Sequence, residues 1–147
     1  MIILDTTVLA YAAGAEHPLR DPCRRILEAA SRGSIVAVTT THVIEEFVYV
    51  RARRRSREDA AELGRRYATL LAPLIATDAD DLEEGLRLYV AHQSLGSCDS
   101  MLAAVALRRD ARALMSADRT FAKVPGLRHV DPMDADGIDA LIGGRLP

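Results

Sequence analysis

The chain has 147 residues, which suits one domain with a full hydrophobic core, and its apolar fraction of 49% argues against disorder. Its net charge of -2 gives no global basic field of the kind that indicates nucleic-acid binding. No apolar run approaches the roughly 18 residues of a membrane span, and no secretory signal is visible, so we expect a cytoplasmic protein without membrane contact. Cys23 and Cys98 alone indicate neither a disulfide framework nor a zinc site.

Short apolar runs alternate with longer helical patterns along the chain. We expect strands at residues 2–5, 35–38, 74–77, 113–116 and 128–131. Helices are expected at residues 18–32, 41–55, 57–71, 80–92 and 99–110, with short helices after Asp118 and after Pro132. This alternation predicts an α/β fold, with helices on both faces of a central, mostly parallel sheet of four or five strands. No composition break marks a second domain, so residues 1–147 are expected to form one.

The first candidate site residue, Asp5, ends the apolar run MIILD. Ligands of open α/β sheets bind at the carboxyl ends of strands, where this carboxylate would lie. The alternative is a helix N-cap or a turn residue, since Asp is favoured at both. A phosphohydrolase with an aspartyl nucleophile would carry a second acid two residues later, where this chain has Thr7. A metal ligand is therefore the better functional interpretation of Asp5.

Two adjacent acids, Glu45 and Glu46, lie within the helical pattern HVIEEFVYV. The apolar face of that helix places Glu46 near the edge of the buried side and Glu45 further toward solvent. A carboxylate at such a boundary is partly desolvated and tends to need a partner. Glu46 is thus the better candidate ligand, while Glu45 remains an alternative.

Two further acids lie in the second half of the chain. Asp99 opens an apolar helix, and Asp118 follows the expected strand at residues 113–116, at the same sheet edge as Asp5. Each also has an ordinary interpretation, Asp99 as a first-turn residue and Asp118 as a turn former. Asp5, Glu46, Asp99 and Asp118 have no obvious cationic partners, so together they predict a divalent metal site. The acids at residues 78–84 are instead interpreted as a solvated helix start.

Five arginines follow Glu46, at positions 51, 53, 54, 55 and 57. A solvated helix end is the default interpretation of such a run. Arg53 nevertheless lies seven residues after Glu46, hence on nearly the same helix face and about 10 Å along its axis. From there it would contact a phosphate next to the one being cleaved. Thr6 and Ser116, beside the acids, are also expected to contact the substrate.

With these residues collected, the chain resembles the PIN-domain nucleases, and within them the VapC toxins of bacterial toxin–antitoxin pairs. The resemblance covers nearly the whole chain and rests on the blocks LDTTVLAYA, VIEEFVYVRARR and CDSMLAAVALRRDARALMSADRTF. It matches Asp5, Glu46, Asp99 and Asp118 to the acids of that family. The family often has Thr in place of Ser116, and another acid is common in place of Thr120, which leaves open how many acids complete the site.

The resemblance implies a PIN-like three-layer sandwich and an endoribonuclease that depends on Mg²⁺ or Mn²⁺. It also implies a small VapB-type antitoxin that covers the active-site groove, and a homodimer that forms a heterotetramer or larger assembly with it. The acids agree with attack by metal-bound water, which would leave a 5′-phosphate and a 3′-hydroxyl. Structured cellular RNA, such as tRNA or rRNA loops, is the expected substrate.

Two other functions remain open from the sequence. One is a metal-dependent phosphohydrolase that acts on small phosphate esters, and the other is a non-catalytic RNA-binding or regulatory module with the same fold. The sequence also leaves open the RNA and its cleavage site, the number of metal ions, the identity of the antitoxin and the dimer surface.

Overall fold

A computed structural model describes residues 1–144 of the protein. Within these residues, the sheet has four parallel strands in the order β2-β1-β3-β4. The strands are β1 (Ile2–Leu4), β2 (Ala37–Val38), β3 (Ala113–Met115) and β4 (His129–Val130). Ile3 pairs with Val38 on one side and with Leu114 on the other. The predicted α/β class and the parallel sheet are therefore confirmed.

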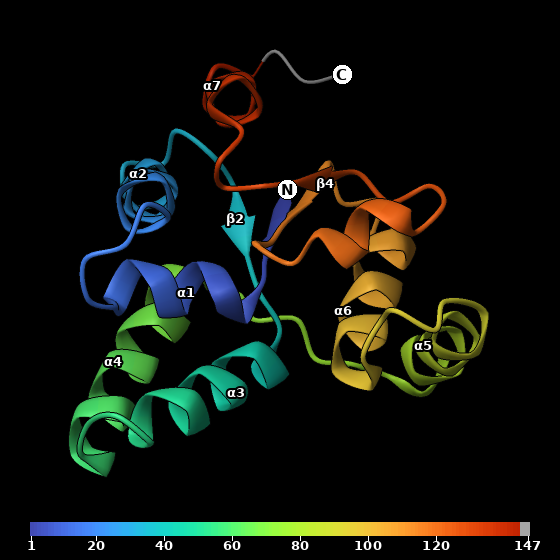
Figure 1. The fold of residues 1–147 in the computed structure, drawn as a ribbon, viewed down its shortest axis with the longest axis horizontal. Coiled ribbons are helices and arrows are strands. Elements are labelled where there is room, and N and C mark those ends of the chain that lie inside the picture. Colours follow the sequence, from blue (N-terminus) through green and yellow to red (C-terminus); the bar gives the residue numbers. More distant parts are fainter. Residues whose placement is uncertain (145–147) are drawn as a thin grey trace.

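Helices flank the sheet on both sides (Figure 1). They are α1 (Thr6–Ala13), α2 (Arg20–Ser31), α3 (Thr41–Ala52), α4 (Arg57–Leu70), α5 (Ala79–Ala91), α6 (Ser97–Arg108), the 3-10 helix η1 (Arg119–Lys123) and α7 (Ala135–Ile142). In Figure 1, α1, α3 and α4 lie on one side of the molecule, and α5 and α6 lie together on the other. In the part of the chain that the structure describes, no helix is long and apolar enough to cross a membrane.

The hydrophobic core lies around the two central strands. Ile3, Leu4 and Leu114 have no exposed surface, because helices cover both faces of β1 and β3. Parallel strands buried in this way consist of continuous apolar residues, as these two do. The middle of α6, residues 102–106, is buried all round, which confirms the prediction of a buried helix after Asp99.

Helix α1 was not predicted from the sequence. It starts with the β-branched residues Thr6, Thr7 and Val8, which favour a strand over a helix. The chain turns into a helix because Asp5 has extended backbone angles and its side chain accepts a hydrogen bond from the Thr7 N–H, as an N-cap does. This cap brings the residues after β1 back across the sheet edge.

The prediction of a strand at residues 74–77 was wrong. This segment forms only an isolated parallel bridge, between Ile75 and Thr40, with bonds from Ile75 N to Thr39 O and from Thr41 N to Ile75 O. The bridge lies beyond the end of β2, and α3 begins at Thr41. The neighbouring chain therefore leaves the sheet before a longer ladder can form.

Candidate active site

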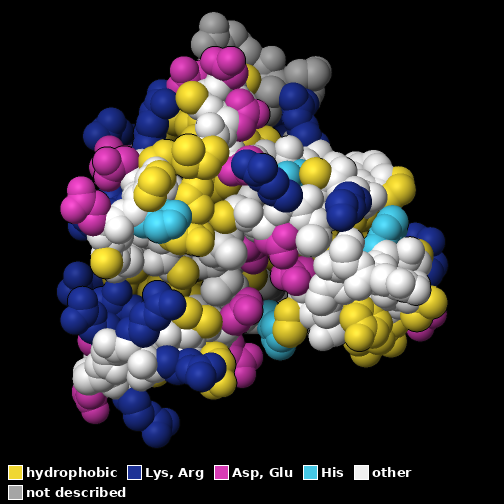
Figure 2. All heavy atoms as spheres, in the orientation of Figure 1, with side chains coloured by type: hydrophobic (Ala, Val, Ile, Leu, Met, Phe, Trp, Pro, Cys, Tyr) yellow, Lys and Arg dark blue, Asp and Glu magenta, His cyan; other side chains and the backbone are white. Residues whose placement is uncertain are grey.

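Four elements bring the predicted acids to one edge of the sheet. Asp5 follows β1 and Asp118 follows β3, and these strands are parallel neighbours, so their carboxyl ends lie side by side. Glu46 comes from the middle of α3, and Asp99 from the first turn of α6. Figure 2 shows acidic side chains gathered at the centre of one face, between α1–α4 and the α5–α6 pair.

Asp5 is buried and held by hydroxyl groups. It is 4% exposed, and its Oδ2 accepts hydrogen bonds from Thr7 N at 3.2 Å, Thr7 Oγ1 at 2.6 Å and Ser116 Oγ at 2.7 Å. The N-cap interpretation of Asp5 is thus structurally correct. The N-cap role of Asp5 is compatible with a role as a metal ligand, because the cap uses only one carboxylate oxygen.

Glu46 is held toward Asp5 by the residue that follows Asp5. The Thr6 hydroxyl donates to Glu46 Oε2 at 2.5 Å, across 40 positions of sequence. Glu46 is exposed rather than partly desolvated, so the preference for it over Glu45 on the ground of desolvation was wrong. Glu45 has an 80% exposed side chain and lies 3.7 Å from His42 Nδ1, and it does not line the cavity that Glu46 shares with Asp5.

Asp99 is half-buried and carries the clearest electrostatic signal of the site. Burial, followed by the charges of Asp5, Asp118 and Glu46, raises the pKa of Asp99 from 3.8 to about 6, although a backbone hydrogen bond from Gly96 acts the other way. A Cβ at position 96 would meet Asp99 Oδ2 at 2.8 Å, so a larger residue there would require the Asp99 side chain to shift. The four acids therefore act on one another.

Asp118 adopts the turn that the sequence suggested. Its Oδ1 accepts a hydrogen bond from Thr120 N at 2.8 Å, and its own N–H donates to Ser116 Oγ at 2.9 Å. Thr120 has a buried hydroxyl oxygen without a hydrogen-bond partner among the described residues. Asp118 does not line the main cavity, but its charge contributes to the raised pKa of Asp99.

A cavity of about 200 Å³ opens beside three of the acids, Asp5, Glu46 and Asp99. Its other walls are mostly apolar and come from α3, α5 and α6, and they also include Thr40, His42, Thr77 and Cys98. A second hollow continues from it along α5 and α6, past Leu86 and Tyr89. The acids thus lie at one end of a groove long enough for more than a single small group.

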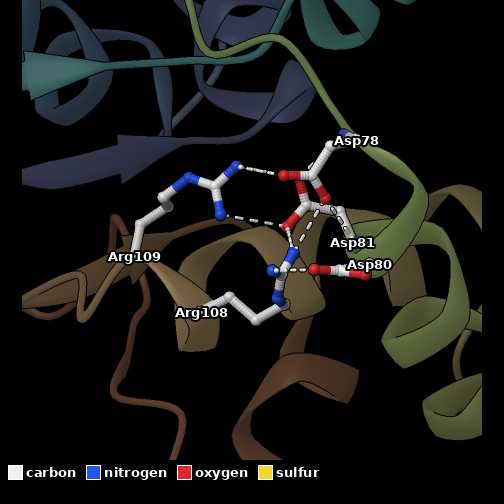
Figure 3. A network of polar contacts seen from close by, with 5 residues as sticks. All are labelled: Asp78, Asp80, Asp81, Arg108 and Arg109. Carbon is white, nitrogen blue, oxygen red and sulfur yellow. Dashed lines mark hydrogen bonds and ion pairs between the residues drawn. The ribbon is translucent and has the colours of Figure 1, made fainter.

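The four acids have no cationic partner among residues 1–144. The contrast within the molecule is Asp81, which is fully buried and bonded by Arg108 at 2.7 Å and Arg109 at 2.9 Å (Figure 3). The same arginines pair with Asp78, and Arg108 pairs with Asp80. The sequence suggested that the acids at residues 78–84 form a solvated helix start, and for Asp81 this prediction was wrong. Two arginines thus offset most of the charge of that acidic cluster, whereas the acids around Asp5 have no such partner within residues 1–144.

The donor set fits a small hydrated cation. Within the described residues, no three His, Cys, Asp or Glu side chains lie close enough to hold an ion by themselves. A cation bound here would therefore take few direct carboxylate ligands and keep several waters. Mg²⁺ binds in this way, through one or two carboxylates with waters and substrate phosphate.

The residues predicted to contact substrate differ in their exposure. Thr6 is 6% exposed and Ser116 is fully buried, and both hydroxyls point to carboxylates. Arg53 is exposed at the end of α3, with its guanidinium 5.6 Å from the centroid of the Tyr49 ring. Tyr49 and Thr7 were not proposed as site residues from the sequence, although the sequence DTT at the end of a strand is a signal for hydroxyls beside an acid.

Comparisons with known proteins agree with this geometry. The model of the PIN domain matches residues 2–127. Ribonuclease VapC7 of Mycobacterium tuberculosis is 50% identical over 149 residues, covering 99% of this chain and all of its relative, and Ribonuclease VapC13 of the same organism is 31% identical over 88% and 99%. The crystal structure of M. tuberculosis VapC20, described as a sarcin-ricin loop cleaving toxin, superposes with a TM-score of 0.69 at 19% identity, covering 87% of this chain and 99% of VapC20.

The chain belongs to the PIN-domain family. Within that family, its full-length similarity is to VapC ribonucleases, which confirms the resemblance found in the sequence.

Proposed function

We propose that the protein is a metal-dependent endoribonuclease toxin that cleaves structured cellular RNA, such as tRNA or rRNA loops. The observation that carries this proposal is the cluster of Asp5, Glu46, Asp99 and Asp118, which shares one sheet edge and has no counter-charge in the part of the chain that the structure describes. The ribonuclease activity in the names of its full-length relatives supports the same assignment.

Asp5, Glu46, Asp99 and Asp118 are the residues that would hold Mg²⁺ or Mn²⁺, directly or through water. The bound cation supplies positive charge for the phosphate oxygens and makes a coordinated water more acidic. The chain contributes the fixed orientation of Asp5 and the apolar walls around the acids, which limit competing water. This chemistry predicts products with a 5′-phosphate and a 3′-hydroxyl.

RNA would approach over the end of α3. Among the described residues, Arg53, Arg54 and Arg55 form no ion pair with an acid, whereas Arg51 pairs with Asp59 at 2.6 Å. Figure 2 shows basic side chains gathered on the same side of the molecule as α3 and α4, next to the central acids. Tyr49, which is 63% exposed, offers a ring for an unpaired base, and Arg53 offers a charge for the adjoining phosphate.

The proposal includes a VapB-type antitoxin as partner. The groove beside the acids has apolar walls, and α5 exposes Leu82, Leu86 and Tyr89 along it. An antitoxin segment that covers these side chains would bury apolar surface and exclude RNA at once. We also propose a cytoplasmic homodimer that binds antitoxin as a heterotetramer or larger assembly.

The decisive experiment uses purified protein, freed of antitoxin, with defined RNA loops and Mg²⁺ or Mn²⁺. We expect cleavage that stops in excess chelator and in Asp5→Asn or Asp99→Asn, while Glu45→Gln, a matched acid on the solvent side of α3, cleaves normally. Mass spectrometry of the ends tests the water mechanism, since 2′,3′-cyclic phosphates would contradict it. Hydrolysis of p-nitrophenyl phosphate with intact RNA would indicate a phosphohydrolase, and RNA binding without cleavage a regulatory module.

A further inference from the structure

The four acids share a pattern that the proposed function does not require. Each one uses a carboxylate oxygen or face inside the protein: Asp5 Oδ2 with Thr7 and Ser116, Glu46 Oε2 with Thr6, Asp118 Oδ1 with Thr120 N, and Asp99 with the Gly96 backbone. Within residues 1–144, no donor contacts Asp5 Oδ1, Glu46 Oε1 or Asp118 Oδ2. Each of these three acids thus keeps one oxygen free.

The arrangement at Asp5 is the most restrictive. Three donors converge on Oδ2, and the two hydroxyls among them are themselves fixed, because Thr7 Oγ1 accepts from Ala117 N at 3.0 Å and Ser116 Oγ accepts from Asp118 N at 2.9 Å. Each hydroxyl has a single hydrogen, and the contacts to Asp5 Oδ2, at 2.6 and 2.7 Å, are shorter than the 3.3 Å between Thr7 Oγ1 and Ser116 Oγ, so both hydroxyls donate to Asp5. The carboxylate therefore cannot rotate without breaking its bonds to Thr7, in α1, and to Ser116, just after β3.

Glu46 is held in a similar way, by the single hydroxyl of Thr6. Thr6 is buried and lies in the first turn of α1, so the position of its Oγ1 is set by the backbone. Glu46 is an exposed side chain with several rotatable bonds, and within residues 1–144 the Thr6 hydroxyl is its side-chain hydrogen-bond partner. Ordering such a side chain costs conformational entropy, which a hydrogen bond to a charged group offsets.

We propose that Thr6, Thr7 and Ser116 are positioning residues that limit Asp5 and Glu46 to one cation-facing oxygen each, and thereby select a small six-coordinate cation over Ca²⁺. This inference rests on the proposed function of the acidic cluster. Ca²⁺ takes six to eight oxygens and often binds carboxylates through both of theirs, whereas Mg²⁺ requires a nearly ideal octahedron with several waters. A carboxylate with one oxygen already hydrogen-bonded within the protein suits the Mg²⁺ octahedron. The buried hydroxyls therefore act through the acids and not on RNA.

The test measures binding of Mn²⁺ alone to the antitoxin-free protein, by calorimetry or electron paramagnetic resonance, with Ca²⁺ as competitor. We expect Thr7→Val and Ser116→Ala each to lower Mn²⁺ affinity about tenfold, the size usual for groups that orient metal ligands. Each substitution should also reduce the ratio of Mn²⁺ affinity to Ca²⁺ affinity. Thr7→Ser, which keeps the hydroxyl, restores both. Thr6→Val tests the Glu46 contact separately, with Thr6→Ser as its rescue.

The matched control is Thr39→Val. Thr39 is equally buried at the same sheet edge, but its hydroxyl donates to the Leu4 carbonyl at 2.7 Å and to no acid. We expect Thr39→Val to lower the stability of the protein without changing its preference for Mn²⁺ over Ca²⁺. If Asp5→Asn loses Mn²⁺ while Thr7→Val, Ser116→Ala and Thr6→Val keep wild-type affinity and preference, the positioning inference is wrong and the metal site stands. If Asp5→Asn binds Mn²⁺ as the wild type does, the metal site itself is wrong.

Discussion

Asp5, at the end of β1, and Asp99, in the first turn of α6, interact through charge although 94 positions separate their numbers in the sequence. Burial of Asp99 has the largest effect on its pKa, and the charge of Asp5 has the next largest. Folding therefore brings together groups that repel one another, which is a cost to stability in the absence of a cation. That relationship gives the first two predictions.

Asp99→Asn should stabilise the metal-free protein at neutral pH. The pKa of Asp99 is raised to about 6 in the folded protein from its ordinary value of 3.8, so the folded state binds this proton more tightly than the unfolded state does. Stability contributed by Asp99 therefore falls as pH rises from about 4 to 6 and stays low above that window. After a discount for solvent screening, we expect Asn to raise the free energy of unfolding by about 1 kcal/mol at pH 7. Urea denaturation at pH 7 and pH 4 checks this, and an equal gain at both pH values would contradict it.

Mg²⁺ or Mn²⁺ should raise the melting temperature of the wild-type protein at pH 7. A cation that binds only the folded state stabilises it by mass action, and here it also relieves the repulsion around Asp99. Differential scanning fluorimetry with increasing Mn²⁺ measures the shift, which should be absent in Asp5→Asn. Glu45→Gln is the control, because Glu45 lies outside the cavity and should leave the shift unchanged.

Arg53 and Tyr49 should affect RNA binding more than chemistry. Removal of the ring in Tyr49→Ala should cost about 1 kcal/mol, which corresponds to about fivefold in KM with kcat nearly constant. Arg53→Ala should raise KM and also weaken the dependence of KM on salt, since one phosphate contact is lost. Arg65→Ala removes an equally exposed arginine from α4 and should change neither quantity. A fall in kcat with constant KM would contradict this assignment.

Asp81 should be important for stability and not for catalysis. It is fully buried, bonded to Arg108 and Arg109, and completes a capping box with Asp78 at the start of α5. Asp81→Ala would leave two cations without this buried partner, so we expect the free energy of unfolding to fall by about 3 kcal/mol. Asp80→Ala, whose side chain is 83% exposed in the same network, should cost less than about 1 kcal/mol. Chemical denaturation distinguishes them, and similar losses for both would refute the distinction.

Much of the architecture was predictable because it depends on local patterns. Continuous apolar runs predicted β1 and β3, and residues 101–107, which are apolar nearly all round, predicted the buried helix α6. Local patterns were ambiguous at α1, where three β-branched residues follow a strand and the Asp5 cap alone turns the chain. At residues 74–77 the pattern suited a strand, but no neighbour extends far enough to pair with it.

The sequence by itself determined that Asp5 and Asp118 follow strands, so a parallel sheet had to bring them to one edge. Only the tertiary structure decided which acids lack a counter-charge. Asp81 and Asp99 look alike as acids near helix starts, yet Arg108 and Arg109 reach the first while other carboxylates surround the second. The contacts of Thr6 and Ser116 were decided in the same way, because their hydrogen bonds join residues 40 and 111 positions apart. Such contacts depend on strand register and helix packing, which no local pattern of residues encodes.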